Sequence, residues 1–125
     1  MSHSYKELIV WQKAKALAGD VYRTTDNFPR HETYGLTSQL RRAAVSVASN
    51  IAEGQGRLTK GEFQQFLGHT RGSLLELETQ LAIAVDLHYL RLDELTFLEA
   101  KTSKLRRLLN GLIDSLRTKS KAAAS

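Results

Sequence analysis

The sequence predicts an all-α fold, an antiparallel up-down-up-down four-helix bundle. Apolar residues, mainly leucine and alanine, recur at three- and four-residue steps in four separate segments, which is the spacing of one helix face. The chain has 125 residues and one proline, Pro29, so long uninterrupted helices are possible. Because short connections between long helices force neighbouring helices to run in opposite directions, the three short breaks predict the antiparallel order.

The first helix is predicted over about residues 5–25, and its end is set by Pro29, because the residue before a proline is pushed out of helical geometry. The second is predicted over about residues 33–53, with Gly54 as a left-handed C-cap. The apolar stripe of the first helix consists of Leu8, Trp11, Ala14, Leu17 or Ala18, and Val21. That of the second consists of Leu36, Leu40, Ala44, Val47 and Ile51, widened by Ala43 and Ala48.

The third helix is predicted over residues 60–88, where Thr59 and Glu62 fit a capping box at its start. Gly68 and Gly72 interrupt it, and we expect them to permit a tight helix crossing. The fourth is predicted over residues 94–117 with Asp93 as N-cap, followed by a frayed tail, residues 118–125. The two apolar stripes consist of Phe63, Phe66 or Leu67, Leu74, Leu77, Leu81 and Ala84 or Val85, then Leu95, Leu98, Leu105, Leu108 or Leu109, Leu112 and Leu116.

Length and composition indicate a single domain, residues 1–125, of cytoplasmic location. The absence of cysteine excludes disulfides and thiolate metal sites. The first residues do not resemble a secretory signal, and no segment approaches the roughly 18 apolar residues that cross a membrane.

The sequence contains no pattern that indicates catalysis, a metal or a cofactor. A di-iron or di-manganese bundle needs Glu-x-x-His pairs, and no glutamate here is followed by histidine three residues later. The four histidines, His3, His31, His69 and His88, lie on different elements. A supported serine nucleophile and a phosphate-binding loop are also missing. We therefore expect a non-enzymatic protein without catalytic residues, metal or cofactor.

The charge distribution points to a polyanionic partner. The net charge is +5, and residues 30–60 carry five basic and two acidic side chains, whereas residues 99–125 carry seven and two. Such segments suit nucleic acid, although solvated helix faces that complement one another explain them equally well. The candidate phosphate contacts are Arg41, Arg42, Arg57, Lys60, Lys104, Arg106, Arg107 and Arg117.

A polar stripe runs along the second helix beside its apolar stripe. It consists of Gln39, Arg42, Ser46, Asn50 and Glu53. Either it is a solvated face, or it meets polar residues of another helix or subunit. In the second case, Glu76 and Glu78 of the third helix are candidates to pair with Arg41 or Arg42.

The second helix carries a motif that resembles a known family. Residues 36–54 read LTSQLRRAAVSVASNIAEG, and further matching segments are VWQKA at 10–14, GSLLELET at 72–79 and NGLIDSL at 110–116. They resemble the bacterial four helix bundle protein family, also called 23S ribosomal RNA intervening-sequence proteins. Two departures are Ala48, where many members have proline, and His69-Thr70, which replaces an apolar-small pair.

The resemblance implies an antiparallel bundle assembled as a ring, typically a homopentamer. Some members are encoded within intervening sequences of ribosomal RNA genes. A similar group comprises the accessory proteins of diversity-generating retroelements, which bind nucleic acid and a reverse transcriptase. The leading hypothesis is therefore a homo-oligomer that binds nucleic acid, with RNA preferred over DNA. The alternative is an oligomeric scaffold or adaptor for another protein, such as a reverse transcriptase, without nucleic-acid binding; neither hypothesis involves a membrane.

Overall fold

Four α-helices make up most of the computed structural model, which describes residues 4–124 and the side chains of residues 4–117. The helices are α1 (Ile9–Thr25), α2 (Leu36–Gln55), α3 (Lys60–Asp86) and α4 (Leu92–Ala124). Two short 3-10 helices, η1 (Tyr5–Glu7) and η2 (Arg30–Glu32), precede α1 and α2. No strand occurs within residues 4–124, so the all-α class and the four helices are confirmed.

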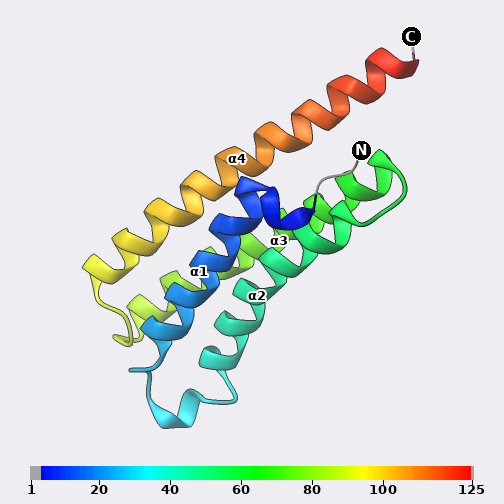
Figure 1. Ribbon diagram of the computed structural model, residues 1–125. Coiled ribbons are helices and arrows are strands. Elements are labelled where there is room, and N and C mark those ends of the chain that lie inside the picture. Colours follow the sequence, from blue (N-terminus) through cyan, green and yellow to red (C-terminus); the bar gives the residue numbers. More distant parts are fainter. Residues whose placement is uncertain (1–3, 125) are drawn as a thin grey trace.

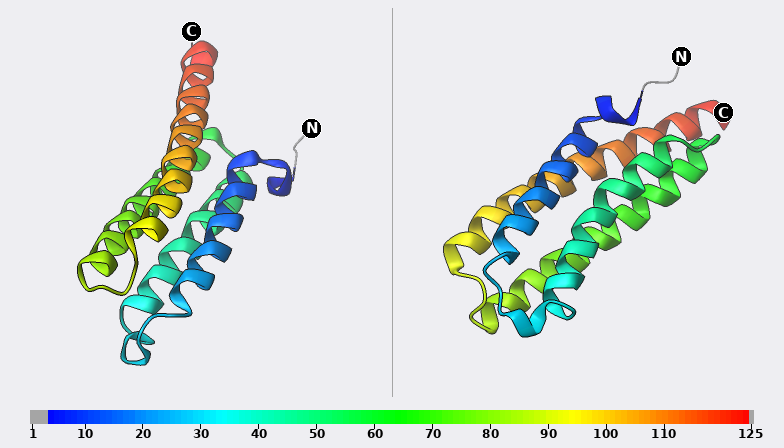
Figure 2. Two further views of the ribbon diagram at one scale, coloured as in Figure 1. Left: turned by 90° about the vertical axis from the view of Figure 1, so that its left-hand side faces the viewer. Right: turned by 60° about the horizontal axis from the view of Figure 1, so that its bottom comes forward.

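The helices pack side by side in one bundle (Figure 1). α2 and α4 each contact both α1 and α3, whereas α1 and α3 lie diagonally opposite each other. Residues that are far apart in sequence meet across these contacts: Gln39 in α2 lies against Gln80 in α3, and Ser46 lies against Ser73. The turn between α2 and α3 lies at the same end of the bundle as the C-terminal end of α4, and the other two connections lie at the opposite end (Figures 1 and 2).

The core is built from the leucine- and alanine-rich stripes. Its largest fully buried side chains come from all four helices and include Leu17, Leu40, Ile51, Leu67, Leu74, Leu77, Leu81, Leu98, Leu105 and Leu109. These positions confirm the predicted periodicity. Trp11 and Leu95 lie at the edge of the core, whereas Val10, which the periodicity did not select, is buried.

Three threonines occupy core positions without leaving their hydroxyl groups unpaired. Thr25, Thr70 and Thr102 are each buried, and each hydroxyl donates to a carbonyl of its own helix three or four residues earlier. Thr102 thus fills the apolar stripe of α4 between Leu98 and Leu105. Because the backbone satisfies the hydroxyl, the cost of burying it is small. His69, which directly precedes Thr70, is by contrast exposed.

The first two helices begin later than their periodicity predicts. Leu8 is extended (φ −72°, ψ 127°), so residues 5–7 form a separate 3-10 turn in which the Ser4 side chain accepts from the Lys6 N–H. α2 starts at Leu36, whose N–H donates to the Glu32 carboxylate at 3.0 Å. This hydrogen bond, with one from the Tyr89 hydroxyl, holds the pKa of Glu32 below its usual range. Glu32 therefore caps α2 from outside the helix.

Glycines act differently from the prediction at two places. Gly54 is not a left-handed C-cap, because α2 continues to Gln55 and Gly56 is the cap with φ −81°. Gly54 is instead where α3 comes close, since a Cβ there would lie 2.8 Å from Cβ of Phe66 and 2.9 Å from Cδ1 of Phe63. The expected tight crossing at Gly68 and Gly72 is wrong for this chain, because a Cβ at either would meet no described atom within 4 Å.

The ends of α3 and α4 combine confirmed and corrected features. Thr59 is the N-cap of α3, and its hydroxyl accepts from the Glu62 N–H at 3.1 Å. α3 ends at Asp86 rather than near residue 88, because His88 adopts a left-handed conformation (φ 63°) and the Tyr89 N–H donates to the Ala84 carbonyl.

Asp93 is not the N-cap of α4, which already begins at Leu92. Glu94 accepts from the Arg91 N–H instead, in the manner of a capping box. The tail expected to fray is helical to Ala124, since lysine and alanine are strong helix formers and no proline or glycine follows Gly111. Ser125 of that tail lies outside the described residues, as do residues 1–3 with His3.

Candidate nucleic-acid interface

The polar stripe of α2 is divided between an interhelical contact and solvent. The Ser46 hydroxyl lies 3.0 Å from that of Ser73 in α3, and the Asn50 amide donates to both the carbonyl and the hydroxyl of Ser46 at 2.9 Å. Arg42 and Glu53 are exposed, and neither side chain has a polar partner among the described residues. The stripe is therefore partly a polar seam between α2 and α3.

Gln80 extends this seam into the bundle. It is almost fully buried, and its amide nitrogen donates to Glu76 at 3.1 Å and to Gln39 at 3.4 Å. Its carbonyl oxygen has no hydrogen-bond partner within the described residues. The sequence pattern did not select Gln80. A single glutamine that interrupts an apolar stripe does not indicate whether its side chain is buried or exposed.

The predicted pairing of Glu76 or Glu78 with Arg41 or Arg42 is wrong. Glu76 accepts from Gln80 on its own helix, and Glu78 forms an ion pair with Arg106 in α4. The reason is geometric: Glu78 lies on the side of α3 that faces α4, whereas Arg41 lies on the side of α2 that faces α1.

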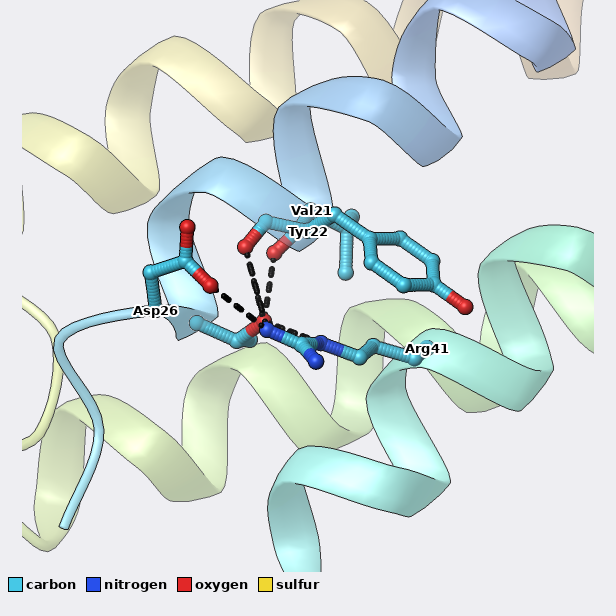
Figure 3. A network of polar contacts seen from close by, with 5 residues as sticks. Val21, Tyr22, Asp26 and Arg41 are labelled. Carbon is cyan, nitrogen blue, oxygen red and sulfur yellow. Dashed lines mark hydrogen bonds and ion pairs between the residues drawn. The ribbon is translucent and has the colours of Figure 1, made fainter. Parts of the chain in front are cut away.

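Arg41 binds the C-terminal end of α1 (Figure 3). Its Nε donates to the Thr25 hydroxyl at 2.9 Å, and its Nη2 donates to Asp26 at 3.0 Å and to the Tyr22 carbonyl at 3.3 Å. The guanidinium also lies over the Tyr22 ring, 4.6 Å from its centroid. A cation at a helix C-terminus complements the helix dipole. These contacts occupy Arg41 in joining α1 to α2.

The eight candidate phosphate contacts thus fall into two groups. Arg41 and Arg106 are committed to carboxylates of the fold, and Arg117 lies 3.8 Å from Asp114 in an exposed pair. Such an exposed pair contributes little and is easily exchanged for another anion. The second group is exposed and has no ion-pair partner in the described part of the chain: Arg42, Arg57, Lys60, Lys104 and Arg107.

The second group does not form one continuous patch. Arg57 lies in the α2–α3 turn and Lys60 begins α3, Lys104 and Arg107 lie along α4, and Arg42 lies in the first half of α2. Lys104 is joined by two further lysines that sequence reasoning missed. A recess of about 140 Å³ between α1 and α4 is lined by Lys13, Ala16, Lys101 and Lys104. Only the packing of α1 against α4 brings Lys13 to this place, so no local signal could have identified it.

Lys101 has a structural partner as well. Its ammonium group pairs with Asp20 of α1, which also accepts from Arg23 at 2.9 Å. Burial raises the pKa of Asp20, but the hydrogen bonds from Lys101 and Arg23 outweigh it, so the pKa is lower than usual. Asp20 therefore remains ionised and neutralises part of the lysine recess.

Two separate apolar surfaces are exposed. Three apolar side chains in the C-terminal half of α3 and at its end are exposed, and we call them the apolar row: Leu75 and Ile83 in the helix and Leu87 at its C-cap, with exposures of 50%, 44% and 47%. The second surface is a shallow groove between α1 and α2, lined by Tyr5, Trp11, Lys15, Ala18, Val45, Ala48, Ser49 and Ala52. Within the described residues, no group of three or more histidines and carboxylates could hold a metal ion, and no helix is long and apolar enough to span a bilayer.

Comparisons with known proteins agree with the motif in α2. The sequence model of the 23S rRNA-intervening sequence protein family matches residues 6–111. A crystal structure from Bacteroides thetaiotaomicron VPI-5482, a protein of unknown function from the S23 ribosomal protein family, superimposes with a TM-score of 0.76. The two sequences are 18% identical, and the match covers 84% of this chain and 98% of that one. None of the curated proteins matches the sequence. Because the family match covers most of the helical bundle, the chain belongs to the 23S rRNA-intervening sequence protein family.

Proposed function

We propose that this protein is a non-enzymatic homo-oligomer that binds nucleic acid in the cytoplasm, with RNA preferred. The observation that carries the proposal is the set of exposed cations without carboxylate partners in the described residues: Arg42, Arg57, Lys60, Lys104 and Arg107. None of these charges forms an ion pair with another described residue, whereas Arg41 and Arg106 are used by the fold. Free cations on a helical bundle are suited to phosphate contacts.

The arrangement favours binding to the nucleic-acid backbone over readout of base sequence. The free cations lie on several elements rather than on one helix presented to a groove. Phosphate contacts of this kind position a nucleic acid without reading its sequence. The description of the family names the intervening sequence of 23S rRNA, which supports RNA as the preferred class.

Assembly into a ring of antiparallel bundles would multiply these weak contacts. The antiparallel order is supported by the pairing of Gln39 with Gln80 and of Ser46 with Ser73. The apolar row and the α1–α2 groove are different surfaces of one chain. If the row of one copy packs into the groove of the next copy, the contact is heterologous. Heterologous contacts form closed rings when the rotation between copies closes, and five copies are the number expected from the resemblance.

The test is absolute mass in solution, measured by light scattering with and without a short RNA at about 50 mM salt. We expect a whole-number multiple of the 14.0 kDa chain that gains mass when RNA is added. Affinity should fall as salt rises, because each phosphate contact releases counterions. A monomer that gains no mass with RNA or duplex DNA at this salt would overturn the proposal.

A matched pair of variants distinguishes phosphate contacts from structural cations. Arg107→Gln removes a free charge, whereas Arg106→Gln removes the neighbouring charge that pairs with Glu78. We expect Arg107→Gln to weaken binding and to reduce the slope of log affinity against log salt by about one. Arg106→Gln should lower the free energy of unfolding and leave that slope nearly unchanged.

A protein-interaction scaffold is the second candidate, favoured by the exposed apolar row of Leu75, Ile83 and Leu87, which phosphate binding does not use. The partner would be a protein, such as a reverse transcriptase, that contacts the bundle and its basic surface. Purification from the native host decides between the two, because a protein partner that remains bound after nuclease treatment favours the scaffold. Loss of all partners on nuclease treatment favours nucleic-acid binding.

A further inference from the structure

In the α2–α3 turn a cation lies over an aromatic ring, a contact that we call the Arg57–Phe66 stack. The guanidinium group of Arg57 lies 4.4 Å from the centroid of the Phe66 ring, and the ring of His69 packs edge-on against the same phenylalanine at 5.7 Å. Arg57 and His69 are exposed, and Phe66 is half-buried. A planar cation therefore lies on an aromatic support at the end of the bundle.

The support is held in place by backbone contacts. Phe66 packs against Gly54, where even a methyl group would lie 2.8 Å from its Cβ. The Arg57 N–H donates to the Gly54 carbonyl at 3.1 Å. Two residues later, the Thr59 hydroxyl caps α3 by accepting from the Glu62 N–H. Because the turn has only four residues between Gln55 and Lys60, the backbone of Arg57 has little freedom. The backbone of Arg57 is consequently held beside Phe66, which lowers the entropy cost of keeping the guanidinium over the ring.

The other face of the guanidinium is available for a ligand. Arg57 forms no ion pair with an acidic side chain of the described residues. The next residue, Leu58, is 98% exposed, and Lys60 is exposed as well. A carboxylate binds a guanidinium at its edge, in the plane, whereas a flat ring binds its face. The geometry of Arg57 on Phe66 therefore favours a planar ligand.

We propose that the Arg57–Phe66 stack is a binding site for one unpaired base of single-stranded RNA, with Lys60 contacting the adjoining phosphate. The inference rests on the proposed function and adds a substrate class to it. Arginine planes and aromatic rings are the platforms on which proteins stack unpaired bases. A base inside a duplex is already stacked on its neighbours, so duplex RNA gains nothing from this site.

The experiment compares an oligoadenylate with a duplex RNA of equal length, using fluorescence anisotropy at about 50 mM salt. Arg57→Lys keeps the charge and loses the plane, and Arg107→Lys is the matched control on α4, away from any aromatic ring. We expect Arg57→Lys to weaken single-strand binding by about 5- to 10-fold, with less than about a twofold effect on the duplex. Arg107→Lys should change either affinity by less than about twofold.

A second readout reports stacking directly. An oligoadenylate that contains 2-aminopurine should lose emission on binding to the wild-type protein and lose less on binding to Arg57→Lys or Phe66→Leu. Phe66→Leu also tests whether the aromatic ring under Arg57 is needed. If Phe66→Leu unfolds at a lower temperature, Arg57→Lys alone tests the inference, because Arg57 is a surface residue. The inference is overturned if Arg57→Lys binds the oligoadenylate as wild type does. Duplex binding then still supports the proposed function, whereas a wild-type protein that binds neither of these RNAs nor duplex DNA overturns both.

Discussion

Arg41 of α2 donates a 2.9 Å hydrogen bond from its Nε to the hydroxyl of Thr25, the last residue of α1. Thr25 in turn donates to the Val21 carbonyl at 2.8 Å. Arg41 thus links the end of one helix to the side of the next through a buried hydroxyl, and Nη2 of Arg41 reaches the Tyr22 carbonyl as well. The most basic dipeptide of the α2 motif, Arg41-Arg42, therefore begins with a structural residue.

We expect Arg41→Ala to lower the free energy of unfolding by about 1–3 kcal/mol. The substitution removes the hydrogen bonds that Arg41 donates to the Thr25 hydroxyl, the Tyr22 carbonyl and Asp26, together with the contact over the Tyr22 ring. Urea denaturation followed by circular dichroism measures the change.

Arg42→Ala is the control for Arg41→Ala, because Arg42 is exposed and has no polar partner in the described chain. Its effect on stability should stay within about 0.5 kcal/mol. Nucleic-acid affinity should show the opposite order, with the larger loss at Arg42. Equal stability losses for the two variants would contradict the structural role of Arg41.

Sequence reasoning could not separate these two neighbours. Both are arginines at adjacent positions, and which of them meets α1 depends on the rotation of α2 in the bundle. The same holds for Lys13, which becomes part of a basic recess only because α1 packs beside α4. By contrast, the apolar stripes and the Thr59 cap were predictable, since each depends on residues within a few positions of one another.

Gly54→Ala is expected to destabilise the bundle by about 1–3 kcal/mol, because the added methyl group overpacks the contact with α3. Cβ would lie 2.8 Å from Cβ of Phe66 and 2.9 Å from Cδ1 of Phe63. This loss exceeds the gain of up to about 1 kcal/mol in helix propensity. Thermal and urea denaturation provide the measurement.

Gly111→Ala supplies the matched control in α4, since a methyl group there would meet no described atom within 4 Å. The propensity gain is then unopposed, and we expect stability to rise by about 0.5–1 kcal/mol. If Gly54→Ala is also stabilising, the close approach of α2 and α3 at this residue is wrong.

The Asp20 cluster predicts an acid-sensitive contribution to stability. Hydrogen bonds from Lys101 and Arg23 outweigh the burial of Asp20 and lower its pKa from the ordinary value of 3.8. At pH values between the folded and unfolded pKa of Asp20, the unfolded chain therefore binds more protons than the folded chain. The stability that Asp20 contributes is present above about pH 5 and is lost as pH falls through the folded pKa. Compared with wild type, Asp20→Asn should be less stable at neutral pH.

Urea midpoints between neutral pH and about pH 3 test this, because the gap between wild type and Asp20→Asn should narrow as Asp20 is protonated. Glu99→Gln is the control, since Glu99 is exposed and its carboxylate has no partner in the described residues. A gap between wild type and Asp20→Asn that stays constant down to that pH would show that the ion pair contributes no pH-dependent stability.

Ile83→Glu is expected to break the proposed oligomer without unfolding the chain. Ile83 lies in the apolar row of α3 and is 44% exposed, so a charge is tolerated in the single chain and costly only where a second copy covers it. Light scattering should show a fall toward 14.0 kDa, while circular dichroism stays helical. Ala100→Glu, which adds the same charge to an exposed position of α4, should leave the mass unchanged.

The single tryptophan makes the same experiment report on the other surface of the contact. Trp11 lines the groove between α1 and α2, where the α3 row of the next copy would lie in a heterologous ring. If Ile83→Glu separates the copies, water reaches the groove and the Trp11 emission should shift to longer wavelength. A drop in mass without any shift would mean that α3 contacts a different surface, because the substitution lies on α3 and Trp11 on the diagonally opposite helix.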